Sequence, residues 1–208
     1  MLLNFNNKKD IAKLKYISNK IIYDYVIIGS GPAATVLYRE ILKYKKKKIL
    51  LIERGNFEKK IVEKVCYNYL PINLRSRIFS VGGTSNEWSS FSSYFEDFEL
   101  TDRWKKKSTN LWPFSSNYLK KIYNNLDNSY GFNFKKISKK KFNFPFQIRG
   151  FIANNNPINF KNLINTNKID LLINCPVETV SENENISNVN IEDNSIKISG
   201  KKIILCAG

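Results

Sequence analysis

The feature that most limits the fold of this chain lies near its amino terminus, where an apolar run is followed by closely spaced glycines. Residues 25–28 (YVII) indicate a strand that is buried on both faces of a parallel sheet. A turn with Gly29 and Gly31 follows, and residues 33–44 carry apolar side chains at helical spacing. This order predicts an α/β fold in which the amino terminus of a helix faces an anionic ligand.

Each small residue of the turn has a physical use. Gly29 permits a sharp turn, and Gly31 lets the backbone approach a pyrophosphate closely. Pro32 suits the first turn of a helix, where its missing N–H costs no hydrogen bond. Ala34 is small enough for the helix to pack tightly on the strand. The turn is therefore the predicted pyrophosphate site.

A second apolar strand, residues 48–52, ends at an acid. Glu53 follows Gly29 by 24 residues, close to the ~20 expected for the acid that binds the ribose hydroxyls of a dinucleotide. A carboxylate there also repels a 2′-phosphate, which disfavours NADP. The whole unit of strand, turn, helix, strand and acid predicts dinucleotide binding far more specifically than the glycines alone.

Composition excludes several classes of protein. The 208 residues suit one domain or a domain with a small appendage, and 42% of them are hydrophobic. No long apolar segment indicates a signal peptide or a membrane span. The three cysteines lack a CxxC spacing, which favours reduced thiols and a cytoplasmic protein. The sequence has no histidine, which excludes histidine bases, triads and metal ligands.

The net charge of +16 raises the alternative of a basic module that binds nucleic acid or a membrane surface. The lysines are spread over several short runs and are not gathered in one arm. Abundant Lys, Asn, Ile, Phe and Tyr together favour AT-rich coding over selected basicity. Nucleic acid is therefore not the expected partner.

The remaining chain predicts helices and loops up to residue 157, and mainly strands from residue 169 onward. Residues 1–19 predict a short amphipathic helix, residues 56–77 a loop with a helix-like patch, and residues 80–90 a glycine turn whose backbone suits a cofactor. Residues 112–116 predict the entry to a helix, and residues 117–128 carry a helical stripe of core-facing side chains that includes Tyr118. Residues 131–157 predict a surface excursion, with a strand-like stretch at residues 142–146. Strands then follow at residues 169–174, 177–180, 189–191, 196–198 and 203–206. The first and last of these strands are expected in the buried sheet, and the middle ones in an antiparallel meander.

With these landmarks in order, the chain resembles the FAD-binding part of the glucose–methanol–choline oxidoreductase family. The opening YDYVIIGSGPAA with LLIERG is similar to the amino-terminal signature of the family. VGGTSNEW at residues 81–88 is similar to its Gly-Gly segment, and residues 203–208 resemble the strand that returns beside the cofactor. The resemblance implies an α/β, Rossmann-like FAD/NAD(P)-binding domain with a parallel sheet, a small antiparallel β-meander and a helical or irregular insertion.

The resemblance also implies roles for individual residues, all of them in cofactor binding. The pyrophosphate would lie against Gly29, Gly31, Pro32, Ala33 and Ala34. Glu53 would hold the adenosine ribose, with Arg54 beside it. The ribityl and flavin side would be lined by Gly82, Gly83, Thr84 and Ser85. The backbone around Val177 would meet the adenine, and Ala207 and Gly208 would lie near the cofactor. No catalytic residue and no metal ligand is assigned.

Two departures from the family qualify the expected function. Some members hold FAD covalently through a histidine, but Glu87 stands in that neighbourhood here, so FAD is expected to bind non-covalently. The family's substrate-binding half, with its active-site histidine, is also not expected within residues 1–208. Residues 1–208 are therefore expected to be an incomplete FAD-binding domain, with an insertion over residues 56–160.

The leading hypothesis is the FAD-binding portion of an oxidoreductase that acts on CH–OH groups, in a truncated or split form that is inactive alone. A complementary carboxy-terminal chain or domain would then be a partner, and an alcohol or sugar would bind only to the complete enzyme. A non-catalytic remnant and the basic binding module remain as alternatives. NAD in place of FAD is a minor alternative, which the Gly-Gly-Thr-Ser segment and the late strand disfavour.

Overall fold

The structure, a computed structural model, describes residues 1–44, 46–58, 78–87, 95, 116–130, 160–182, 186–191 and 195–207, with the backbone of three short strands between residues 61 and 71. The chain divides into two compact units, Met1–Glu87 with Asn159–Gly208, and Trp88–Ile158. Three predicted parts lie outside the described residues. They are the helix entry at residues 112–115, the excursion at residues 131–157 with its strand-like stretch, and Gly208.

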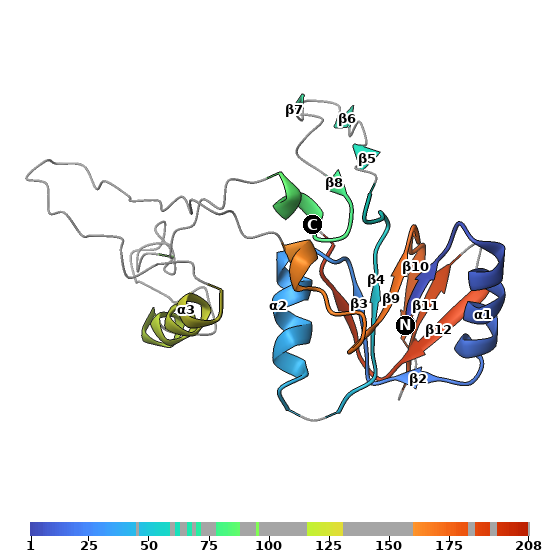
Figure 1. Cartoon of the computed structure of the whole chain (residues 1–208), viewed down its shortest axis with the longest axis horizontal. Helices are drawn as coiled ribbons and strands as arrows, with labels where there is room; N and C mark the ends of the chain where they lie inside the picture. Colours follow the sequence, from blue (N-terminus) through green and yellow to red (C-terminus); the bar gives the residue numbers. More distant parts are fainter. Residues whose placement is uncertain are drawn as a thin grey trace, which may run out of the picture. The chain divides into compact units, whose positions relative to one another are not determined.

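The first unit is built on a parallel sheet of five strands, as the sequence predicts (Figure 1). In spatial order the strands are β1 (Leu2–Asn4), β9 (Asp170–Ile173), β4 (Ile49–Ile52), β3 (Tyr25–Ile28) and β13 (Ile203–Leu205). The central pair aligns Ile28 with Ile52, so both strands end at the same edge of the sheet. Parallel strands place their following loops together at that edge, which is where α/β folds bind ligands.

A second sheet of four strands lies in the same unit. It contains β10 (Thr179–Glu182), β11 (Ser187–Ile191), β12 (Ile196–Gly200) and β2 (Ile22–Tyr23). The first three strands pair antiparallel, which confirms the predicted meander. The two-residue β2 extends this sheet by pairing parallel to β12 and was not predicted, because it is too short to show a period.

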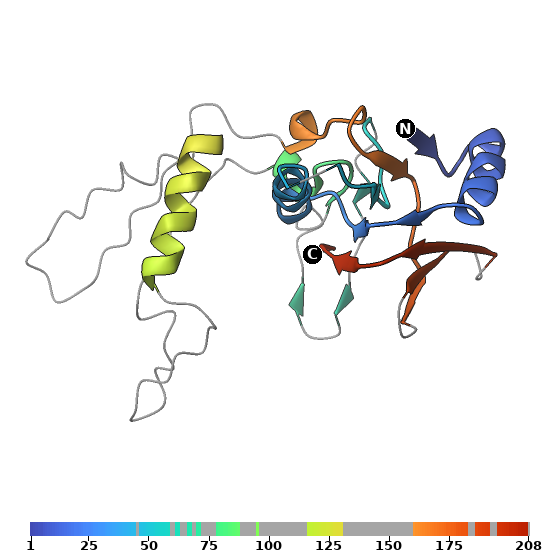
Figure 2. The ribbon, with the colours of Figure 1, turned by 90° about the horizontal axis from the view of Figure 1, so that it is seen from below.

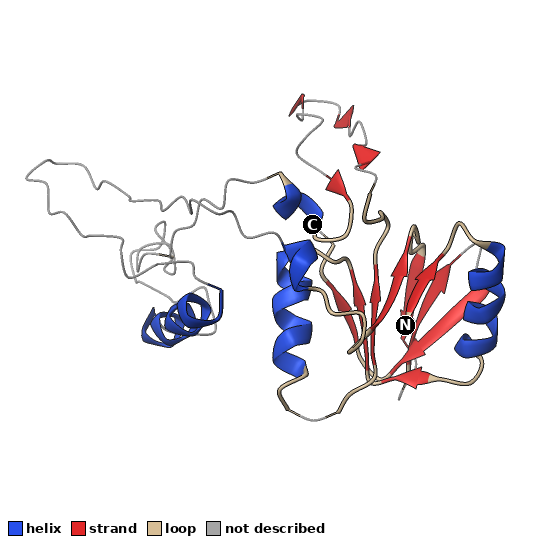
Figure 3. Cartoon of the chain, in the orientation of Figure 1, coloured by secondary structure: helices blue, strands red, loops and turns tan. Residues whose placement is uncertain are grey.

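Two helices complete the layers of this unit. The helix α1 (Lys8–Ser18) packs through Leu14 and Ile17 into a core shared by the antiparallel sheet and one face of the parallel sheet. The helix α2 (Pro32–Ile41) packs through Ala34 and Tyr38 on the opposite face. Figure 3 shows the two helices on opposite sides of the strands, and Figure 2 gives the perpendicular view.

Some boundaries and placements differ from the sequence analysis. The chain begins with β1 before α1, and α2 ends at Ile41 because the amides of Lys43 and Tyr44 bond carbonyls three residues earlier in a tighter turn. β13 does return parallel to β3, but as the edge strand of the described sheet. Its burial is less than expected, since Leu205 is 69% exposed.

Between the strand β4 and the glycine turn, the chain forms short strands where a helix-like patch was expected. β5 (Ile61–Val62) pairs with β8 (Ile78–Phe79), and β6 (Cys66–Tyr67) pairs with β7 (Leu70–Pro71). Later in the chain, two single 3-10 turns, η1 (Gly83–Asn86) and η4 (Phe160–Leu163), contact each other.

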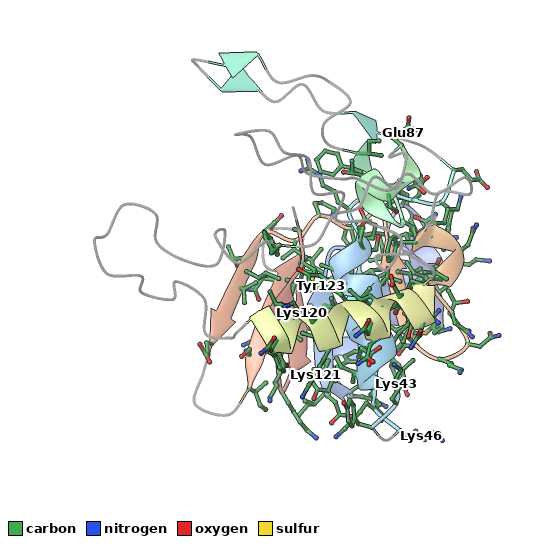
Figure 4. All side chains as sticks on the ribbon, turned by 90° about the vertical axis from the view of Figure 1, so that its left-hand side faces the viewer. Lys43, Lys46, Glu87, Lys120, Lys121 and Tyr123 are labelled. Atoms are coloured by element: carbon green, nitrogen blue, oxygen red, sulfur yellow. The ribbon has the colours of Figure 1, made fainter. Side chains whose placement is uncertain are left out.

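The second unit contains the helix α3 (Ser116–Tyr130), close to the predicted helix. Leu119 is buried, but Tyr118 is 54% exposed, so Tyr118 does not belong to the core-facing stripe as predicted. Tyr123 lies on the same helix as the exposed Lys120 and Lys121, and its hydroxyl accepts a hydrogen bond from the amide of Phe95 (Figure 4). None of the helices in the described part of the chain is long and apolar enough to cross a membrane.

Candidate functional site

The turn between β3 and α2 is held by a close backbone contact. Gly29 has a φ of +93°, and a Cβ there would lie 2.8 Å from the carbonyl oxygen of Cys206 and 2.9 Å from the amide nitrogen of Ala207. The glycine is therefore required by the chain that follows β13 as well as by the left-handed conformation. The same contact places Ala207 beside the turn.

Gly31 differs from Gly29, because the protein itself does not require a glycine there. Its φ of −66° and ψ of −174° are extended, and a Cβ would meet no atom of the residues that the structure describes within 4 Å. Gly31 caps the amino terminus of α2, followed by Pro32 at the first helical position. The open space thus lies where backbone N–H groups and the positive end of the helix dipole favour an anion.

The two alanines after the proline divide between surface and core. Ala33 is exposed at the amino terminus of α2, and Ala34 is fully buried in the core beneath it. Ala34 packs in one cluster with Ile27 and Leu51 of the parallel sheet. This confirms that a small residue at position 34 serves the close approach of helix and strand.

The second glycine segment lies against the first. Gly82 and Gly83 both have positive φ angles, +92° and +58°. A Cβ on Gly83 would lie 3.2 Å from the Cα of Gly31. The structure therefore brings together two segments that are about fifty residues apart in the sequence. Thr84 is exposed beside this contact, whereas Ser85 is buried and donates its hydroxyl to the Gly82 carbonyl oxygen at 2.6 Å.

Glu53 points into the turn. Its side chain is 6% exposed, and Oε2 accepts hydrogen bonds from the Ser30 amide at 2.9 Å and the Ser30 hydroxyl at 2.5 Å. Oε1 accepts a hydrogen bond from the Gly55 amide at 2.8 Å. Burial raises the pKa of this carboxyl group, and the hydrogen bonds from Ser30 and Gly55 oppose that rise because they favour the carboxylate.

Sequence reasoning missed three residues that organise this site. Ser30 is fully buried, and its hydroxyl lies 3.1 Å from the amide nitrogen of Gly82 as well as next to Glu53. The carbonyl oxygen of Ser80 is 3.5 Å from the same hydroxyl. Gly55 has no room for a side chain, since a Cβ would lie 2.1 Å from the carbonyl oxygen of Phe79. The only signal in the sequence was their position next to motif residues.

The remaining predicted residues are exposed or only half-buried. Arg54 is exposed, with its guanidinium 4.4 Å from the centre of the Phe79 ring. Val177 is half-buried against the core. Two residues earlier, the amide of Cys175 donates a hydrogen bond to the carbonyl oxygen of Glu53, so this segment passes beside Glu53. Glu87, at the end of η1, is exposed (Figure 4).

The thiols and acids do not form a further centre in the part of the chain that can be described. Cys175 and Cys206 are free there, and burial raises the pKa of the Cys175 thiol to about 12. Within the same residues, no three His, Cys, Asp or Glu side chains gather as a metal site would require. The chemistry that this arrangement supports is the binding of an anionic nucleotide by backbone amides, a helix dipole and one carboxylate.

Comparison with known proteins reveals a likeness in structure only. No protein-family model matches the sequence, and no curated protein matches it. Pyridoxine 4-oxidase from Mesorbium loti aligns with 89% of this chain at 14% identity and a TM-score of 0.57, covering 49% of the oxidase. Formate oxidase from Aspergillus oryzae aligns with 89% of this chain at 12% identity and a TM-score of 0.47, and 45% of the oxidase is covered. A fungal aryl-alcohol oxidase aligns with 90% of this chain at 12% identity and a TM-score of 0.47, and 46% of that oxidase is covered.

The chain thus spans about half the length of the solved structures that it matches. These oxidases are glucose–methanol–choline oxidoreductases, the family that the sequence motifs resemble. The Rossmann-like α/β fold predicted from the sequence is confirmed, and the chain has the fold of the amino-terminal part of pyridoxine 4-oxidase.

Proposed function

We propose that this chain binds FAD non-covalently and is the FAD-binding portion of a flavin-dependent oxidoreductase that acts on CH–OH groups. The observation that carries the proposal is the space beside Gly31 at the amino terminus of α2, where a Cβ would meet no atom of the described residues within 4 Å. The fold itself does not need a glycine at this position of the helix amino terminus. A bound pyrophosphate would fill the space that a side chain would otherwise take.

The proposed contacts combine the geometry of the turn with the roles that the family resemblance implies for the other residues. Gly31, Pro32 and Ala33 present the amino terminus of α2 to the pyrophosphate, while Gly29 shapes the turn. Glu53 accepts hydrogen bonds from the ribose hydroxyls. The segment from Gly82 to Ser85 lines the ribityl and flavin side, the backbone at Val177 meets the adenine, and Arg54, Ala207 and Gly208 flank the ligand.

The redox chemistry would belong to the bound flavin, which takes up a hydride from an alcohol carbon. The chain would hold and orient the cofactor, but it offers no histidine as a base for the hydroxyl proton. We therefore propose that these residues alone do not oxidise alcohols or sugars. Turnover would need a complementary domain or chain that supplies the substrate site.

Two further points remain predictions from the sequence. The first is the division into one FAD-binding domain with an insertion over residues 56–160. The second is a cytoplasmic location, which rests on the three cysteines without paired spacing.

Titration of FAD with the purified chain tests the proposal directly. We expect flavin fluorescence to change on binding and a visible flavin spectrum to co-elute with the protein in gel filtration. Acid precipitation should release all the flavin, since the binding is non-covalent. ADP should displace FAD, whereas ADP that carries a 2′-phosphate should displace it poorly, because Glu53 repels that phosphate.

The outcomes separate the parts of the proposal. Absence of FAD binding at any accessible concentration would contradict it, and flavin that stays with the precipitate would contradict the non-covalent mode. Equal displacement by the two ADP compounds would contradict the role of Glu53. The basic alternative instead predicts binding to DNA or anionic lipid that weakens steeply with salt.

A further inference from the structure

Ser30 lies between the two glycines of the turn, and its hydroxyl makes hydrogen bonds to two segments distant in the sequence. Ser30 is fully buried, and its hydroxyl lies 2.5 Å from Oε2 of Glu53 and 3.1 Å from the amide nitrogen of Gly82. A hydroxyl has one proton to donate and lone pairs to accept. It can therefore donate to the carboxylate and accept from the Gly82 amide at the same time.

We infer that Ser30 is a positioning residue that fastens the Gly82–Gly83 segment against Gly31 and holds the Glu53 carboxylate ready for a ribose. This inference rests on the proposed function, because the ligand concerned is FAD. It adds a coupling between the adenosine side of the ligand, at Glu53, and the flavin side, at Gly82.

The contacts around Ser30 show why its hydroxyl has this effect. The Glu53 carboxylate also accepts hydrogen bonds from the amides of Ser30 and Gly55, so its place does not depend on the hydroxyl alone. The Gly82 amide has its hydrogen bond to the Ser30 hydroxyl across the space between the two glycine segments. Loss of the hydroxyl should thus release the Gly82 side more than the Glu53 side.

A matched control is available one turn into α2. Thr35 is also fully buried, and its hydroxyl donates to the Ser30 carbonyl oxygen at 3.3 Å. Thr35→Val removes a buried hydroxyl next to Ser30 with little change in volume, but it leaves the Ser30 hydroxyl in place. It therefore reports the general cost of losing a buried hydroxyl at this turn.

The first measurement needs no cofactor. Amide hydrogen exchange of Gly82 should speed up by at least about tenfold in Ser30→Ala and stay within about twofold of the natural protein in Thr35→Val. Ser30→Cys keeps a side chain of similar size with a weaker hydrogen-bonding group, so its Gly82 exchange rate should lie between those of Ser30→Ala and Thr35→Val. This variant also provides the test if Ser30→Ala does not fold. Unchanged Gly82 exchange in both Ser30 variants would overturn the inference.

The second measurement compares two ligands, FAD and ADP. Ser30→Ala should weaken FAD by about tenfold and ADP by less than about threefold, because the released segment faces the flavin side. A general loss of stability would weaken both alike, and that result would contradict the inference that Ser30 acts mainly on the Gly82 side. If the natural protein binds no FAD, the proposed function fails and Gly82 exchange alone decides whether Ser30 fastens the segment.

Discussion

Gly83 lies against Gly31, so close that a Cβ on Gly83 would stand 3.2 Å from the Gly31 Cα. Neither residue has a side chain, and no atom of the described residues lies within 4 Å of the place that a Gly31 Cβ would take. The two glycine segments thus meet at the amino terminus of α2, where an anion is favoured.

Gly31→Ala should separate ligand binding from folding. Its Cβ would meet nothing within 4 Å, so the protein should stay folded with a loss in unfolding free energy of about 1 kcal/mol or less, from the poorer helix cap. The Cβ would stand where the pyrophosphate is proposed, so FAD affinity should fall by at least about tenfold. Urea unfolding and FAD titration measure the two effects, and unaltered FAD affinity would place the ligand elsewhere.

Gly29→Ala should behave in the opposite way. The new Cβ would lie 2.8 Å from the Cys206 carbonyl oxygen, and the residue would have to keep a φ of +93°. Strain and backbone displacement together should cost about 2 kcal/mol or more of unfolding free energy. A Gly29→Ala protein as stable to urea as Gly31→Ala would show that Gly29 does not closely contact Cys206 and Ala207, which follow β13.

Gly55→Ala should be the most damaging of the glycine substitutions. A Cβ would lie 2.1 Å from the Phe79 carbonyl oxygen and 2.5 Å from the Ser80 nitrogen, and backbone atoms cannot turn away as a side chain would. We expect a loss of more than about 3 kcal/mol in urea unfolding, or no folded protein in circular dichroism. A loss no larger than that of Gly31→Ala would contradict the structure at this point.

Glu53 should make the stability depend on pH in a defined direction. Burial raises its pKa in the folded protein above the ordinary value of 4.5, so between these two pKa values the folded state binds more protons than the unfolded state. The free energy of unfolding contributed by this group therefore rises as the pH falls through the folded pKa, and it stops rising below pH 4.5.

The comparison of the natural protein with Glu53→Gln isolates this effect in urea unfolding at a series of pH values. The difference between the two should change across the window above pH 4.5, in favour of the natural protein at the acid end. Glu40→Gln is the control, because the Glu40 side chain is partly exposed and pairs with Lys43 at 2.6 Å. A pH-independent difference for Glu53→Gln would contradict the raised pKa.

Tyr23→Phe tests a polar contact between β2 and β9. The Tyr23 side chain is buried, and its hydroxyl donates to Oδ2 of Asp170 at 3.1 Å, while burial raises the pKa of the phenol. Removal of the hydroxyl should cost about 1–2 kcal/mol in urea unfolding, since it leaves a partly buried carboxylate with one donor fewer.

Tyr16→Phe serves as the matched control for Tyr23→Phe. Tyr16 is 62% exposed, and its hydroxyl accepts a hydrogen bond from Lys20 at 2.7 Å. Its loss should change the unfolding free energy by less than about 0.5 kcal/mol, because water replaces an exposed partner. Equal effects of the two substitutions would show that the contact between Tyr23 and Asp170 contributes nothing.

The predictions from the sequence succeeded where local pattern was enough. The strand ending at Ile28, the turn at Gly29, the helix after Gly31 and the buried Ala34 all follow from period and residue size. The meander of short strands was also predicted, because alternating apolar residues and polar turns recur at short spacing. Short edge elements such as β1 and β2 were missed, since two or three residues show no period.

The sequence by itself determined a strand, a glycine turn, a helix and a closing acid, because backbone preference and apolar spacing act between near neighbours. Only the tertiary structure decided that Ser30 contacts Gly82, that Gly55 lies against the Phe79 backbone and that a Cβ on Gly31 would meet none of the described residues. These relationships join residues far apart in the chain, and their distances depend on how whole strands pack side by side.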